Sequence, residues 1–141
     1  MFIFARFFLV VIIGLLMNAC AVNGPLGVQM IQRDNSKTFH ASWLDHGFNQ
    51  SGTILLAIGD KVYTGKPSKV DEANLFGLRN RYGSNGALAS SGSLFTSYYK
   101  AILVDEEGIG MRCDITLELM SSGSGICVDA QQKVYELVIT R

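Results

Sequence analysis

A regular alternation of apolar and polar residues from Ile109 to Leu119 constrains the fold more than any other stretch. The apolar side chains occupy every second position, at Ile109, Met111, Cys113, Ile115, Leu117 and Leu119. The positions between them carry Arg112, Asp114, Thr116 and Glu118, with Gly110 as the exception. A period of two is typical of a β-strand with one face in the core. Such a strand needs further strands beside it, so the alternation predicts a β domain.

The remaining strand-like segments supply these neighbours. Thr38 to Leu44 alternates in the same way, with Trp43 directed into the core. Residues 53–58 and 61–64 flank Gly59-Asp60, a two-residue loop of the type II′ kind that favours a tight hairpin. Three further strands are predicted at 94–104, 125–129 and 134–140. We therefore predict a mainly β domain, a small antiparallel sheet or barrel of six to eight strands.

One segment has a helical character. Ser68 and Asp71 resemble a capping box at the start of a helix running from Ser68 to Arg81. Gly77 weakens this helix by about 1 kcal/mol relative to alanine, and a long irregular crossing loop is the alternative. The following residues, 82–93, are rich in Gly, Ser and Ala and are predicted to form a surface loop. The fold therefore contains at most one short helix.

The N-terminus has the pattern of an export signal. Phe7 to Met17 is apolar throughout except for Gly14, follows Arg6, and leads to Ala19-Cys20. These residues resemble the lipobox of bacterial lipoproteins, although Met17 stands where Leu is usual and Asn18 is an uncommon neighbour of the cysteine. The resemblance implies that the chain is cut before Cys20, that a diacylglyceryl group is attached to its thiol, and that its new amino group is acylated. A bilayer anchored through acylated Cys20 is thus the first expected partner.

Two other interpretations of this segment stay open. Ala19-Cys20-Ala21 also fits an ordinary signal-peptidase site, which would release a soluble periplasmic protein. An uncleaved anchor is the third interpretation, but the apolar run from Phe7 to Val22 is shorter than the ~20 residues that span a bilayer. Under the lipoprotein interpretation the chain divides into a signal peptide (1–19), a lipidated cysteine with its tether (20–37) and a single β domain (38–141). A short strand at 28–31 is an alternative within the tether. Because Ala21 rather than Asp follows the cysteine, the family's sorting rule implies the periplasmic face of the outer membrane.

Cys113 and Cys127 are the cysteines left once Cys20 is lipidated or removed. An even pair in an exported chain predicts a disulfide, in preference to a catalytic thiol or a metal site. The hairpin geometry is a difficulty, because a turn centred on 121–124 would place Cys113 opposite Gln132. A disulfide therefore requires a bulge near Met120 or a shifted register.

Candidate catalytic residues are few. His40 and His46, with Asp45 between them, and the loop at 83–93 are the segments that an enzyme would use, but nothing fixes their geometry. The 12 basic and 12 acidic residues balance, so no nucleic-acid partner is expected. We predict no catalytic residue, no metal ligand and no cofactor.

The C-terminal half carries a second resemblance. Gly110 to Cys113, Ser122 to Cys127 and Val134 to Leu137 are similar to a pattern in small envelope lipoproteins of Gram-negative bacteria, a group of unassigned function. Cysteines about fourteen residues apart bracket a Gly-rich turn there, and a Tyr-x-Leu strand follows. The resemblance implies a disulfide and a β fold, and it carries over no catalytic residue.

These observations favour a membrane-anchored periplasmic lipoprotein with a non-enzymatic binding or structural role in the cell envelope, acting on an envelope protein. The alternatives are a small periplasmic enzyme, an inhibitor of a hydrolase, and an accessory lipoprotein of a secretion or conjugation apparatus.

Overall fold

The computed structural model describes residues 25–44, 52–83, 95–118 and 122–140. These segments form nine strands, one 3-10 turn and one short α-helix. The strands are β1 (Leu26–Gln32), β2 (Thr38–Leu44), β3 (Thr53–Ile58), β4 (Lys61–Gly65), β5 (Ser68–Val70), β6 (Thr96–Val104), β7 (Gly110–Glu118), β8 (Ser122–Asp129) and β9 (Val134–Thr140). The helical elements are η1 (Glu72–Asn74) and α2 (Leu78–Tyr82).

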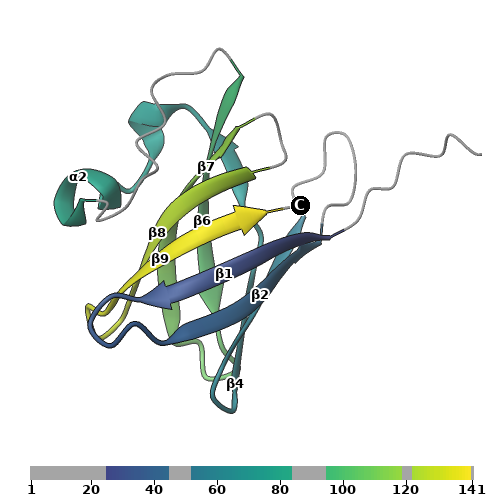
Figure 1. Cartoon of the computed structure of the whole chain (residues 1–141), viewed down its shortest axis with the longest axis vertical. Helices are drawn as coiled ribbons and strands as arrows, with labels where there is room; N and C mark the ends of the chain where they lie inside the picture. Colours follow the sequence, from purple (N-terminus) through teal and green to yellow (C-terminus); the bar gives the residue numbers. More distant parts are fainter. Residues whose placement is uncertain (1–24, 45–51, 84–94, 119–121, 141) are drawn as a thin grey trace, which may run out of the picture.

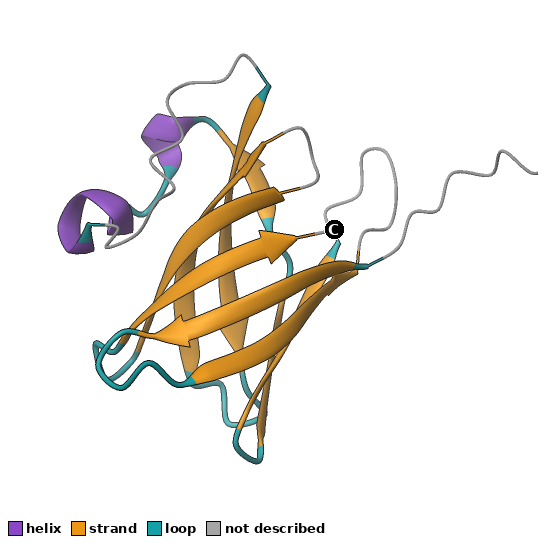
Figure 2. Ribbon diagram, in the orientation of Figure 1, coloured by secondary structure: helices purple, strands orange, loops and turns teal. Residues whose placement is uncertain are grey.

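The strands form an antiparallel barrel of eight strands (Figures 1 and 2). Around the barrel the order is β4-β3-β2-β1-β9-β8-β7-β6, so nearly every strand pairs with its neighbours in the chain. The ring closes where Thr64 of β4 pairs with Val104 of β6. β5 pairs with β6 beyond this point, as a short continuation of β4. The predicted mainly β fold with one short helix is confirmed.

Alternate residues of the strands fill the barrel. On β7, for example, Met111, Cys113, Ile115 and Leu117 are all buried, as the alternation predicts. The same core includes Trp43, whose ring meets that of Tyr99 edge to face, with centroids 5.3 Å apart. Burial of these apolar side chains is the main favourable term in folding.

β1 begins earlier than the sequence predicts. The tether was expected to extend from residue 20 to 37, but Leu26–Gln32 pairs with both β2 and β9 and is an integral part of the barrel. Leu26, Val28 and Met30 face inward, because they alternate with Gly27 and Gln29. The predicted tether is therefore too long, and the β domain includes residues well before 38.

The predicted helix from Ser68 to Arg81 is wrong in most of its length. Ser68 pairs with Lys100 in β5 instead of capping a helix. Gly77 adopts a φ of 73°, a left-handed conformation that glycine accepts readily, and the short α2 starts only after it. No helix in the described part of the chain is long and apolar enough to cross a bilayer.

The Cys113–Cys127 disulfide is present in the structure. The two cysteines lie directly opposite each other on β7 and β8, and their Cα atoms are 4.0 Å apart. Glu118 pairs with Ser122, so the hairpin is centred on residue 120 and not on 121–124. The shifted register, rather than a bulge, resolves the difficulty noted from the sequence.

β7 and β8 approach closely beside the disulfide. A Cβ atom on Gly125 would lie 2.6 Å from the carbonyl oxygen of Asp114 and 2.9 Å from Leu137 Cδ1. Any larger residue would push the backbone of β7 away. Gly125 therefore serves close packing of β7 against β8.

Candidate interaction surface

The barrel interior is filled by apolar side chains as far as the structure describes it. No buried side-chain nitrogen or oxygen among the described residues lacks a hydrogen-bond partner. Small-molecule sites present a few convergent polar groups inside an apolar pocket. Because the interior side chains are packed and satisfied, a functional surface has to be sought on the outside of the barrel.

Among the residues proposed for catalysis, the structure describes His40 and Gly83. His40 lies on β2 opposite Gln29 and is exposed to solvent. Asp45, His46 and nearly all of the loop at 83–93 lie outside the described residues, as does Cys20. No group of three or more His, Cys, Asp or Glu in the described segments is placed to hold a metal ion.

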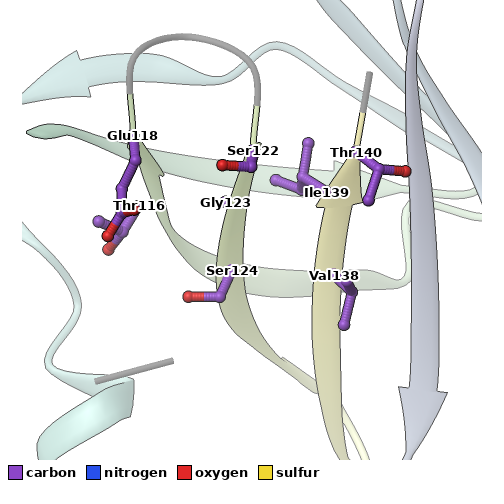
Figure 3. Close-up of a pocket in the computed structure, with 8 residues that line it drawn as sticks. All are labelled: Thr116, Glu118, Ser122, Gly123, Ser124, Val138, Ile139 and Thr140. Carbon is purple, nitrogen blue, oxygen red and sulfur yellow. The ribbon is translucent and has the colours of Figure 1, made fainter. Parts of the chain in front are cut away.

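A depression of about 220 Å³ lies over β7, β8 and β9 (Figure 3). It is lined by Thr116, Glu118, Ser122, Gly123, Ser124, Val138, Ile139 and Thr140. Glu118 alone among these residues carries a charge, so the depression holds no acid–base pair. Its volume is below the ~300–1,000 Å³ of ordinary ligand pockets, and we do not assign it a ligand.

A segment of the chain covers the outer face of β7 and β8. Leu78 of α2 packs on Ile126 and Val128, two apolar residues that point out of the barrel. Residues 71–83, which we call the strap, also receive hydrogen bonds from Arg33, whose guanidinium donates to the carbonyls of Tyr82 and Gly83 at 2.7 and 2.8 Å. The strap therefore removes the apolar outer face of β8 from water.

A second group of outward apolar residues is left uncovered. We call it the seam strip, because it follows the closure between β4 and β6. Its members and their exposed fractions are Leu55 (37%), Val62 (53%), Ile102 (55%) and Val104 (38%). Isolated exposed apolar residues are normal on a protein surface, but contiguous ones mark interaction sites.

The register shows that the seam strip is contiguous. Thr64 pairs with Leu55 on one side and with Val104 on the other, so these side chains share the outer face. Val62 and Ile102 lie two residues from Thr64 and Val104 along their strands, and therefore also point outward. The inward partners in the same strands, such as Leu56 and Leu103, are buried.

Two local features hold β4 against β6, where the only backbone pair that the described residues show is Thr64 with Val104. Gly65 lets β4 approach β6, since a Cβ atom there would collide with the carbonyl oxygen of Ile102. Below the Thr64 pair, the Lys61 ammonium contacts the carboxylates of Asp105 at 3.2 Å and Glu107 at 2.8 Å. Glu107 and Asp105 raise the pKa of Lys61, so its charge persists at all physiological pH values.

Asp105 links the ion pair to the β6–β7 turn. Its side chain is only 3% exposed and accepts hydrogen bonds from the N–H groups of Ile109 at 2.8 Å and Glu107 at 3.0 Å. Burial raises the pKa of this carboxyl, but the hydrogen bonds from Ile109 and Lys61 outweigh burial and hold the pKa below the ordinary value of 3.8. The folded state therefore favours the ionised carboxylate.

This shift predicts acid sensitivity of the seam. A carboxyl with a lowered pKa in the folded state contributes stability above its unfolded pKa, and this contribution is lost as the pH falls through the folded pKa. We expect the urea midpoint of the wild type to fall more steeply below about pH 4 than that of Asp105→Asn. Urea titrations at pH 7 and pH 3 measure this difference, with the exposed Glu106→Gln as the control. An equal fall of the urea midpoint in all three proteins would contradict the role of Asp105 in the acid sensitivity.

Cations border the seam strip. Arg112 pairs with Ile102 across β6 and β7, and its side chain is exposed on the same outer face. Lys66 is exposed two residues beyond Thr64. Neither residue belongs to an ion pair in the described segments, where the salt bridges involve Arg33 and Lys61. The surface is thus an apolar centre with free positive charge at its border.

Sequence reasoning missed the seam strip, although a signal was present. The runs at 53–58 and 101–104 are apolar at consecutive positions, whereas a strand with one solvated face alternates. The outward apolar residues of these runs are either covered by another segment of the chain or exposed to solvent. The sequence does not distinguish the two cases, whereas the fold shows that the strap covers β8 and leaves β4 and β6 uncovered.

Comparison of the chain with protein-family models, curated proteins and solved structures found no match. The functional argument therefore rests on the residues described above.

Proposed function

We propose that this protein is a lipid-anchored envelope protein that acts by binding another protein through the seam strip. The observation that carries the proposal is the strip itself, an exposed and contiguous apolar surface on a barrel whose interior is packed. A non-enzymatic role is in keeping with this surface, since it presents apolar and cationic side chains and no nucleophile.

The proposed anchor is consistent with the position of the strip. Five residues lie between Cys20 and Leu26, so the acylated cysteine can lie at most about 20 Å from the start of β1. Leu26 lies at the barrel end where β6 begins, and two exposed apolar residues, Leu44 and Phe95, lie at this same end. Val62 lies on β4 toward the β3–β4 turn, and Val104 lies beside the β6–β7 turn; both turns are at the barrel end opposite Leu26. An anchored barrel would hold this part of the strip off the bilayer and accessible to a protein.

The proposal includes the outer membrane as location and the periplasm as the compartment, from the lipobox resemblance. A soluble periplasmic protein, an inhibitor of a hydrolase, or an accessory lipoprotein of a secretion or conjugation apparatus would use the same strip. These alternatives differ in the partner that the strip captures and in the state of Cys20.

The anchor is tested by the intact mass of the protein extracted from membranes. We expect a chain that begins at Cys20 and carries acyl groups, and a Cys20→Ser variant that is no longer acylated. A soluble chain that begins at Val22 would contradict the lipid anchor and would indicate a free periplasmic protein.

The binding surface is tested by a photo-crosslinking amino acid placed at Val62 in native cells. We expect a protein adduct at this position and at least tenfold less adduct at Gln29, which is exposed on β1, three strands from β4 around the barrel. Ile102→Ser should reduce the Val62 adduct at least fivefold, because apolar anchors at the centre of an interface carry much of its affinity. Equal yields at Val62 and Gln29 would overturn the proposed binding surface.

A further inference from the structure

We infer that the partner presents an apolar surface bordered by carboxylates. This inference rests on the proposed function, since it concerns what the seam strip binds. Its observation is the pair of exposed cations, Lys66 and Arg112, beside Ile102 and Val104. Complementary charge at the rim of an interface sets its specificity and rate of association.

The third nearby cation is already engaged. Lys100 Nζ lies 5.7 Å from the centre of the Phe76 ring and 3.4 Å from the carbonyl oxygen of Asn74, so it fixes the strap. Lys66 and Arg112 have no such partner among the described residues. Their charges are thus available to a binding partner, and arginine in particular is suited to bidentate contact with a carboxylate.

A lipid surface fits the strip less well than a protein does. Anionic headgroups would also attract Lys66 and Arg112, but a planar bilayer seated on the strip would also cover the β3–β4 and β6–β7 turns beside Val62 and Val104. These turns carry Asp60, Glu106 and Glu107, which would repel an anionic bilayer, whereas a protein can confine its carboxylates to the side of Lys66 and Arg112. The charge pattern therefore favours a protein.

A second copy of this chain also fits less well. Two barrels anchored in one bilayer would pack side by side with parallel axes, and a two-fold axis would bring the β7 side of one strip to the β3 side of the other. β2 and β3 contain no Asp or Glu, so Arg112 would find no carboxylate there. The charge pattern favours a different protein.

The test is charge reversal in the full-length protein in native envelopes. In Lys66→Glu/Arg112→Glu we expect the Val62 adduct to fall at least tenfold. The control, Arg81→Glu/Lys133→Glu, makes the same change in net charge at exposed positions on the strap and the β8–β9 turn, and should leave the adduct unchanged. Raising NaCl in isolated envelopes from 50 to 500 mM should lower the wild-type yield, because exposed charge pairs are screened. The peptide crosslinked to Val62 should contain Asp or Glu beside apolar residues.

The outcomes separate the two proposals. Absence of any adduct above the Gln29 background overturns the proposed binding function itself. An adduct whose yield does not respond to Lys66→Glu/Arg112→Glu overturns only the inferred acidic border. Adducts to phospholipid, or to a second copy of this chain, likewise overturn the acidic protein partner and identify the bilayer or a dimer in its place.

Discussion

Asp114→Ala is expected to lower the free energy of unfolding by about 3 kcal/mol. The carboxylate is buried on the outer face of β7 and accepts hydrogen bonds from the backbone N–H groups of Phe76 and Leu78, both at 2.8 Å. A hydrogen bond to a charged group contributes about 1.5–3 kcal/mol, and a buried donor left without a partner costs about 1–3 kcal/mol. Alanine removes both bonds and leaves two donors beneath the strap.

Urea unfolding of the purified protein measures this loss, with Glu106→Ala as the matched removal of an exposed carboxylate. Hydrogen exchange at the amides of Phe76 and Leu78 separates local release of the strap from global unfolding, because local opening accelerates these amides before the barrel strands. We expect faster exchange in Asp114→Ala and unchanged exchange in Glu106→Ala. A loss below 1 kcal/mol with unchanged exchange would show that Asp114 does not anchor the strap.

Asp114 also illustrates where sequence reasoning reaches its limit. The alternation of 109–119 predicts β7 well, and it places Asp114 and Thr116 on the face away from the core. Both are nevertheless buried, because the strap returns from β5 to cover them. Alternation reports which face meets the barrel interior, but not whether a distant segment covers the other face.

Local sequence patterns were sufficient to predict the strands that adjoin a tight turn. β2 coincides with the predicted 38–44, and the β3–β4 hairpin turns at Gly59, whose φ of 64° is the positive value that a Gly-first loop needs. β5 was missed because it is short and polar. β1 was foreseen only as a short strand at 28–31 within the tether, because it is held by neighbours far away in the sequence. It is fixed by its pairing with β9 at the other end of the chain.

The candidate surface was predictable only in part. Continuous apolar runs identified strands, yet the contact between β4 and β6, which joins their outward residues, is a property of barrel closure. The cations at Lys66 and Arg112 are unremarkable in the sequence, and only the register places Arg112 beside Ile102. The catalytic candidates, by contrast, were proposed from proximity in sequence, and His40 lies alone on an outer face in the described structure.

Removal of the disulfide is the second change with a large expected effect. Cys113→Ala/Cys127→Ala should lower the free energy of unfolding by about 3 kcal/mol, because closure of a loop of about 15 residues restricts the unfolded chain by this amount. Both cysteines are fully buried in the barrel core and separated by 14 residues. For a small barrel this loss is a large fraction of the total stability, which is about 5–15 kcal/mol in typical domains. Urea titration of both proteins without reductant measures it.

Reductant provides the internal control. Dithiothreitol should lower the urea midpoint of the wild type to near that of the double variant, and should leave the midpoint of the double variant unchanged. Because the sulfur atoms are inaccessible in the folded barrel, reduction should proceed only as fast as the protein opens. A wild-type midpoint that does not respond to complete reduction would show that packing around Gly125, and not the covalent bond, keeps β7 and β8 together. The double variant should still be folded without urea and should still give the Val62 adduct. The seam strip lies on β3, β4 and β6, and the register of these strands does not depend on the β7–β8 disulfide.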